Sequence, residues 1–267
     1  MTEPALAREG AARGAFRRVR ALSRFLGYVV INLSVALLWH AGLPFTWGSP
    51  SRRMAWRNST FRTWARASLA CTGVRLVVRG EPPRPPCVLV SNHLCYLDIW
   101  VLASATGCTF VAQSEIADWP FFGFMARQLD VLFIERTRKR AIPGVNRAID
   151  GTLARGHVVA LFPEGTTTDG SAVRPFRPSL LEPAAQGAHP IAWAAIGYRT
   201  SPPDPPASSS VCWVDDTPLA THARGILMLD AIDATLVFGS GILRGSDRKD
   251  LALELRRRVE AEFTPVV

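Results

Sequence analysis

The chain has 267 residues, enough for one large domain or two small ones, with 48% hydrophobic residues and a formal net charge of +9. A positive excess of this size favours anionic partners such as nucleic acid, phosphorylated metabolites or a phospholipid surface. The five cysteines are odd in number and form no C-x-x-C pair. This pattern argues against a disulfide framework or a zinc site and favours a reducing compartment.

The N-terminal region has the composition of a membrane anchor. Arginines are frequent up to Arg24, and the segment from Phe25 to Ser51 then contains no Asp, Glu, Lys or Arg. Its most apolar part ends at Trp39, which makes it shorter than the roughly 20 residues that a spanning helix needs, and Asn32 interrupts it. Arginines also follow the segment, so the positive-inside rule gives no clear orientation.

A helix that lies in the membrane plane, or re-enters it, is compatible with arginines on both sides, and Trp39 and Trp47 would then sit at the interface. Two alternatives are a cleaved signal peptide, for which no small-x-small cleavage site is present, and a buried helix of a soluble core. We expect residues 1–66 to form a basic N-terminal region whose apolar segment covers 25–47. Residues 67–267 are expected to form the main domain.

Beyond residue 66, short β-branched runs alternate with helical patterns. Strands are predicted at 74–78, 87–91, 108–112, 131–135, 157–162, 191–198, 211–214 and 234–239, and helices at 97–105, 119–129 and 143–155. This alternation predicts an α/β fold with a mixed, largely parallel sheet flanked by helices. Residues 201–210 are rich in Pro and Ser and predict a loop. The chain ends with an amphipathic helix that Ser246 or Asp247 can cap.

The sequence SNHLCYLDIW, from Ser91 to Trp100, places His93 just after a predicted strand and Asp98 near the start of a helix. In a regular helix, residues five apart lie about 140° apart around the axis. The two side chains can therefore meet only if His93 lies on the turn before the helix. Asp98 would then bond one ring nitrogen and leave the other free as a general base. The alternative is a core histidine beside a helix-capping aspartate.

Two more polar segments follow predicted strands. In LFPEGTTTDG, Glu164 supplies an acceptor, Gly165 allows close backbone approach, and Thr166 to Thr168 supply hydroxyls. In FIERTRKR, Arg136 opens a basic cluster that can bind phosphate through charge-assisted hydrogen bonds. Taken alone, each segment is equally compatible with an ordinary turn or a solvated loop. The sequence contains no G-x-S-x-G elbow, P-loop or G-x-G-x-x-G motif, and we expect no metal site.

Taken in this order, NHLCYLD, FIER and FPEGTT resemble the motif blocks of the PlsC-type glycerolipid acyltransferase family, with IAWAAIGY at 191–198 as a weaker fourth match. The resemblance implies an acyltransferase that moves a fatty acyl group from a thioester, either acyl-CoA or acyl carrier protein, to a lysolipid hydroxyl, without a bound cofactor or a protein nucleophile. It implies that His93 takes the hydroxyl proton and that Asp98 orients the ring. The residues implied to hold the acceptor are Arg136, Glu164, Gly165 and Thr166.

The sequence departs from the family pattern at Asp130, Thr167 and Trp193, where the family often has Gly, Arg and Pro. The third motif and the segment W-x-D-D-x-P-L-A-x-H, from Trp213 to His222, also resemble the branch that acylates lyso-ornithine lipid. The expected acceptor is 1-acyl-sn-glycerol-3-phosphate, with lyso-ornithine lipid as the alternative.

We expect residues 67–267 to be the acyltransferase domain, held at the cytoplasmic face of the inner membrane. The non-enzymatic alternative is a basic protein that binds membranes or nucleic acid peripherally. Nucleic acid is not expected as a partner, because the basic residues lack the interleaved aromatic side chains that stack on bases.

Overall fold

The computed structural model describes residues 3–113, 131–134, 142–186, 189–214 and 217–267. Within these residues a seven-stranded sheet has the order β1-β7-β6-β2-β5-β3-β4. Its pairs are parallel except β6 with β7, which is antiparallel. The predicted mixed, largely parallel sheet is therefore confirmed. The strands are β1 (Val74–Arg79), β2 (Cys87–Ser91), β3 (Thr109–Gln113), β4 (Leu132–Ile134), β5 (Val158–Leu161), β6 (Ile191–Arg199) and β7 (Ile232–Phe238).

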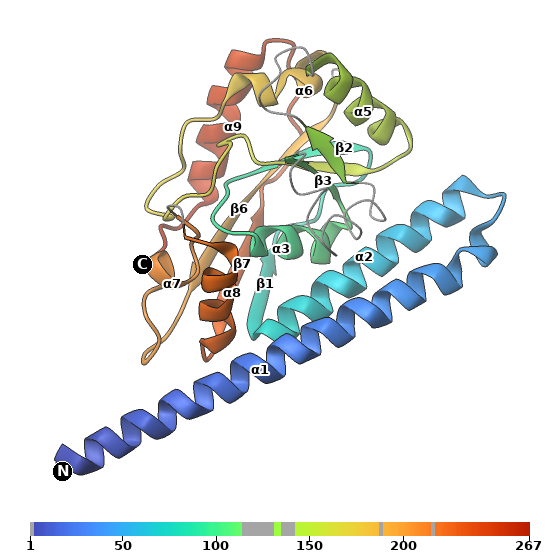
Figure 1. The fold of residues 1–267 in the computed structure, drawn as a ribbon. Helices are drawn as coiled ribbons and strands as arrows, with labels where there is room; N and C mark the ends of the chain where they lie inside the picture. The colour runs from blue at the N-terminus through green and yellow to red at the C-terminus, as the bar shows by residue number, and fades with distance from the viewer. Residues whose placement is uncertain (1–2, 114–130, 135–141, 187–188, 215–216) are drawn as a thin grey trace.

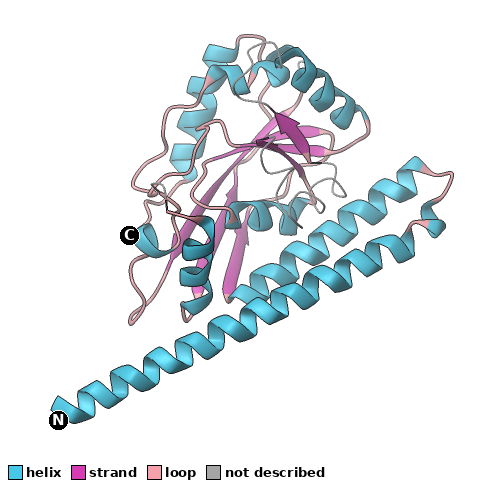
Figure 2. Cartoon of the chain, in the orientation of Figure 1, coloured by secondary structure: helices cyan, strands magenta, loops and turns pink. Residues whose placement is uncertain are grey.

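Helices cover both faces of the sheet (Figures 1 and 2). Strand β2 shows why: all five of its residues are buried, and successive side chains of a strand point to opposite faces. Cys87 and Leu89 join one hydrophobic core, whereas Val88 and Val90 join another. The first core includes residues of α2 (Pro50–Thr72) and α3 (Leu97–Thr106), and the second includes residues of α5 (Ile142–Ala154), α6 (Glu182–Gln186) and α9 (Arg248–Glu262).

The N-terminal region is a hairpin of two long helices (Figure 1). Helix α1 (Glu3–Gly42) is followed by the short 3-10 helix η1 (Pro44–Thr46), after which α2 runs back along α1. The part of α1 from Ala12 to Gly42 is long and apolar enough to cross a membrane by length and composition.

The polar residue that interrupts the apolar segment does not face outward. Asn32 is buried, and its Oδ1 accepts a hydrogen bond of 2.9 Å from the indole of Trp64 on α2. Trp39, expected at the membrane interface, is also buried, and its carbonyl accepts a hydrogen bond from the indole of Trp56. Of the two predicted interface tryptophans, only Trp47 is exposed.

The remaining elements test the predictions for the second half of the chain. Residues 211–214 do not form the predicted strand. They follow the short helix α7 (Ala207–Ser210), and Val211 and Cys212 are buried without joining the sheet. A short apolar run alone cannot separate a strand from another buried segment. Helix α8 (Leu219–Met228) and the 3-10 helix η4 (Pro178–Leu180) were not predicted from the sequence.

The C-terminal helix was predicted correctly, since Asp247 caps α9 by accepting hydrogen bonds from two backbone N–H groups. The helix predicted at 119–129 lies outside the described residues.

Candidate active site

The central pair consists of His93, on the turn after β2, and Asp98, in the first turn of α3. The ring Nδ1 of His93 lies 2.7 Å from Oδ2 of Asp98. An ionised carboxylate can only accept hydrogen bonds, so Nδ1 carries the proton and donates it. The other ring nitrogen, Nε2, is left as an acceptor. The predicted placement of His93 on the strand-to-helix turn is confirmed, and the geometry suits a general base.

The Asp98 carboxylate is completely buried and is surrounded by donors. Its Oδ2 also accepts from the backbone N–H groups of Leu94, at 2.7 Å, and Cys95, at 3.0 Å. Its Oδ1 accepts from the hydroxyl of Tyr198 on β6, at 2.7 Å. A buried carboxylate without such partners would be strongly destabilising. The four donors therefore satisfy the buried carboxylate and fix the direction in which Asp98 presents Oδ2 to His93.

The backbone around His93 is held from two other strands. Asn92 forms two hydrogen bonds with the backbone of Ile196 on β6. The Nδ2 of Asn92 donates to the carbonyl of Ile196, and the N–H of Ile196 donates to Oδ1 of Asn92. The N–H of His93 donates to Oε1 of Glu164 at 2.9 Å, and its carbonyl accepts from the N–H of Thr168 at 3.0 Å. Both Glu164 and Thr168 lie in the segment after β5. The first and third motifs therefore form one structural unit.

The ring of His93 is positioned by stacking as well. It lies parallel to Phe162, with a centroid distance of 4.0 Å and an interplanar angle of 12°. The side chain of His93 is 20% exposed, whereas that of Asp98 is fully buried. The imidazole is therefore accessible while its partner carboxylate is sheltered from water, as a proton-accepting site requires.

Glu164 lies in an environment that favours its protonated form. Burial raises the pKa of its carboxyl from 4.5 to about 7, even though the N–H groups of His93 and Arg174 stabilise the carboxylate. Glu164 is 3% exposed. Near neutral pH the group therefore exists in both forms, and in each form it keeps an oxygen that can accept the hydrogen bond from His93.

The cysteine thiols are poor nucleophiles. Burial raises the pKa of Cys95, which lies between the two central residues, well above its ordinary value. Burial also raises the pKa of Cys212 to about 12. Because the thiolate is the reactive form of cysteine, neither thiol is prepared for covalent catalysis beside His93.

The structure places the predicted acceptor-binding residues unequally. Glu164 and Gly165 are buried next to His93, and Thr166 is exposed beside them. Arg136 lies outside the described residues, and no position is assigned to it. The hydroxyl of Thr167 donates to the carbonyl of Trp213, so it serves to connect two loops.

Sequence reasoning did not find Tyr198 as a partner of Asp98. Tyr198 ends the weak fourth motif, and a hydroxyl that closes on a carboxylate 100 positions earlier has no local signature in the sequence.

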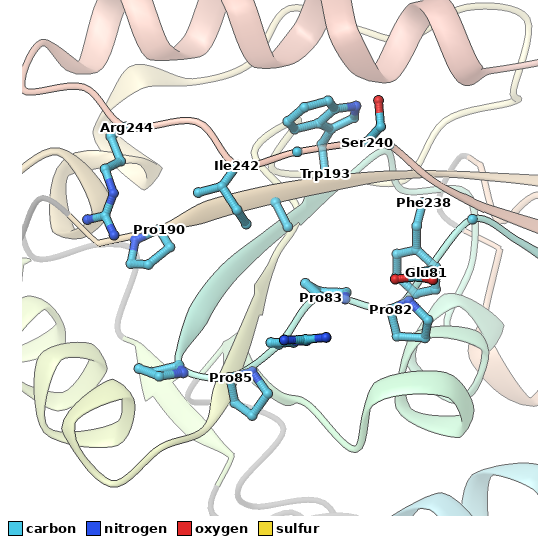
Figure 3. A pocket seen from close by; sticks show the side chains of 16 residues that line it. Glu81, Pro82, Pro83, Pro85, Pro190, Trp193, Phe238, Ser240, Ile242 and Arg244 are labelled. Carbon is cyan, nitrogen blue, oxygen red and sulfur yellow. The ribbon is translucent and has the colours of Figure 1, made fainter.

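A large cavity in the described part of the chain does not contain this pair. Its volume is about 860 Å³, and it lies at the edge where β2 and β6 begin, whereas His93 follows the end of β2 (Figure 3). Its lining is mainly apolar and includes Pro82, Pro83, Pro85, Trp193, Phe238 and Ile242. The choice of His93 and Asp98 as the candidate site therefore rests on their hydrogen bonds and not on cavity size.

The raised pKa of Glu164 predicts a pH-dependent contribution to stability. Between pH 4.5 and about 7 the folded chain retains a proton on Glu164 that the unfolded chain has released. This group therefore makes the folded state less stable as the pH rises through that window. The side chain of Gln in the variant Glu164→Gln is neutral at every pH. The free energy of unfolding of this variant, relative to that of the parent, should therefore increase from pH 4.5 to about 7 and be constant above pH 7. Equilibrium unfolding in detergent measures the difference, and a difference independent of pH would contradict the assignment.

Comparisons with known proteins identify relatives of this chain. A sequence model of the acyltransferase family matches residues 75–197. The chain is 32% identical to the lyso-ornithine lipid O-acyltransferase of Rhizobium meliloti over 74% of this chain and 72% of that protein. It is 34% identical to the 1-acyl-sn-glycerol-3-phosphate acyltransferase of Neisseria gonorrhoeae over 53% of this chain and 56% of that protein.

The fold is shared with a solved structure. The 1-acyl-sn-glycerophosphate acyltransferase PlsC from Thermotoga maritima superposes with a TM-score of 0.65 at 16% identity, covering 92% of this chain and 97% of that one. At this identity the likeness concerns the fold alone. The sequence relatives carry the assignment further: the chain belongs to the PlsC-type acyltransferase family and is an acyltransferase.

Proposed function

We propose that the chain transfers a fatty acyl group from a thioester, either acyl-CoA or acyl carrier protein, to the hydroxyl of a lysolipid. The observation that carries this proposal is the hydrogen bond of 2.7 Å that fixes His93 against the buried Asp98. It leaves Nε2 of an accessible imidazole to accept a proton from a hydroxyl. An activated alcohol that attacks a thioester is the chemistry the family requires.

In the proposed reaction, Nε2 of His93 takes the proton as the lysolipid oxygen bonds to the thioester carbonyl carbon. The tetrahedral intermediate then collapses, the C–S bond breaks, and the imidazolium returns the proton to the leaving thiolate. Asp98 stabilises the imidazolium between these steps without accepting its proton. No acyl-enzyme is needed, which is compatible with the raised pKa of the thiol of Cys95.

Two acceptors are supported by different observations. Lyso-ornithine lipid is supported by the relative from Rhizobium meliloti, which matches over 74% of this chain. Lysophosphatidate, the acceptor expected from the wider family, is supported by the relative from Neisseria gonorrhoeae over 53% of the chain. We place lyso-ornithine lipid first and lysophosphatidate second.

We also propose that α1 holds the enzyme at the cytoplasmic face of the inner membrane. Arginines on one side of α1 are bound to the rest of the chain: Arg17 pairs with Asp204 at 2.6 Å, and Arg24 donates to the carbonyl of Leu229 at 2.6 Å. Much of the remaining surface of α1 is apolar and exposed. Its large exposed side chains include Phe16, Val19, Leu22, Phe25, Leu26, Val30, Leu33 and Leu37. A helix that offers such a face to lipid while α2 returns the chain suits in-plane or re-entrant insertion.

The first prediction concerns acyl transfer. Membranes that carry the chain should esterify lyso-ornithine lipid and, more slowly, lysophosphatidate when supplied with acyl-CoA or acyl carrier protein. His93→Ala should reduce turnover about 10²- to 10⁴-fold, the usual cost of losing a general base. Turnover is measured as radiolabelled product lipid. If membranes with the parent chain esterified neither acceptor faster than membranes with His93→Ala, the enzymatic proposal would fail. Turnover without a thioester would instead indicate a transacylase or hydrolase.

The second prediction concerns the membrane. Phe45 is 81% exposed and Trp47 is 91% exposed, both at the turn of the helical hairpin. Replacing both with Ser should lower the fraction of protein that floats with anionic phospholipid vesicles, because their apolar surface would no longer be buried in lipid. Leu253→Ser on α9, where Leu253 is 71% exposed, is the matched control and should leave flotation unchanged. Equal loss in both variants would refute the role of the hairpin turn.

A further inference from the structure

Two arginines lie on the outer side of the segment that follows the third motif. Val173 and Phe176 of this segment are buried in the core that includes α9, whereas Arg174 and Arg177 are exposed. The backbone is held to the motif itself, since the N–H of Arg177 donates to the carbonyl of Pro163 at 2.8 Å. The packing of the apolar side chains therefore directs both guanidinium groups away from the core at the edge of the active site.

The side chain of Arg177 lies directly on Gly165. Gly165 has a positive φ of 76°, and a Cβ atom added there would lie 2.9 Å from Nε and 3.1 Å from Cζ of Arg177. Any side chain at position 165 would displace the guanidinium. Gly165 directly follows Glu164, whose Oε1 binds the N–H of His93 at 2.9 Å. The guanidinium therefore lies against the residue that follows Glu164 in the chain.

The charge of Arg177 is not neutralised by any carboxylate among the described residues. Within the described residues Arg177 forms no ion pair, whereas Arg256, Arg257 and Arg258 each pair with a glutamate of α9. The nearby Arg174 differs, because its charge interacts with a carboxylate of the protein. The pKa of Asp169 is lowered mainly by hydrogen bonds from Ser171 and, to a smaller extent, by the charge of Arg174. Glu164 is partly protonated near neutral pH, so it would repel a bound anion less than an ordinary carboxylate.

We propose that Arg177 binds the anionic group of the acceptor, the carboxylate of lyso-ornithine lipid or the phosphate of lysophosphatidate. This inference rests on the proposed function and deepens it. The family often has an arginine at the position of Thr167. In this chain, Arg177, ten positions later, would supply the guanidinium instead. A planar guanidinium suits either anion, because both offer paired oxygens for bidentate hydrogen bonds.

The contact of Arg177 with Gly165, the residue after the Glu164 that binds the N–H of His93, favours the acceptor over the donor as the source of this anion. In a lysolipid the reacting hydroxyl lies close to the polar head, so an anion beside Glu164 leaves that hydroxyl within reach of Nε2. In acyl-CoA and acyl carrier protein, the long pantetheine arm separates the thioester from the nearest phosphate. A phosphate bound by Arg177 would therefore hold the thioester carbon away from His93.

The test compares the KM of each substrate in Arg177→Gln and in the parent enzyme in membranes. Loss of a charge-assisted hydrogen bond should raise the KM of the anionic acceptor about 10- to 100-fold and leave the KM of the thioester unchanged. Arg177→Lys, which keeps the charge but loses the paired donors, should recover part of the loss. Monoacylglycerol is an acceptor without an anionic group. The rate at which the enzyme acylates it should differ by no more than a few-fold between Arg177→Gln and the parent.

The matched control is Arg84→Gln, an exposed arginine at the opposite edge of the sheet. It should change neither KM. A rise in the KM of the thioester instead of the acceptor would overturn the proposal, and so would an unchanged acceptor KM in Arg177→Gln. Failure of the proposed function would look different, because the parent enzyme itself would then esterify no lysolipid. Thermal unfolding shows whether Arg177→Gln is folded. If it is not, Arg177→Lys is compared with the parent instead, and an acceptor KM equal to that of the parent would contradict the proposal.

Discussion

The site depends on one buried carboxylate that must satisfy its charge with hydrogen bonds. Asp98 is fully buried, and it receives donors from the ring of His93, from two backbone N–H groups in the same turn, and from Tyr198 on β6. An unpaired charge at this depth would cost several kcal/mol, a large part of the net stability of a typical domain. The contacts that satisfy this buried carboxylate therefore also orient the ring of His93.

The surrounding structure extends this constraint to the whole reaction centre. Asn92 joins β2 to β6 just before His93, and Glu164 with Thr168 fixes the backbone of His93 from the end of β5. The carboxyl ends of parallel strands meet at one edge, which is where such folds place ligands. The helical hairpin packs beside this sheet through α2 and α3. An anchor that rests on lipid would thus hold the site at a constant position relative to the bilayer.

The sequence was informative where chemistry is encoded locally. The five-residue spacing of His93 and Asp98 predicted the strand-to-helix turn, and the alternation of strands and helices predicted the sheet. The fourth donor, Tyr198, could not be found in this way, because its partnership depends on how β6 lies beside β2. The predicted strand at 211–214 was wrong for a related reason, since its apolar residues fill the core without pairing. The domain boundary at residue 66 stays a prediction, and so do the roles of all the predicted site residues: His93, Asp98, Arg136, Glu164, Gly165 and Thr166.

We infer that Asp98 acts through His93, and a double-mutant cycle on the rate of acyl transfer tests this inference most directly. Asp98→Asn should lower kcat about 10²-fold or more in the parent chain, because the ring loses the partner that fixes its tautomer. In a chain that already carries His93→Ala, the same change should cause almost no further loss, since residues that act as a unit are strongly non-additive. Equal losses in both backgrounds, with unfolding showing that each variant is folded, would contradict the account.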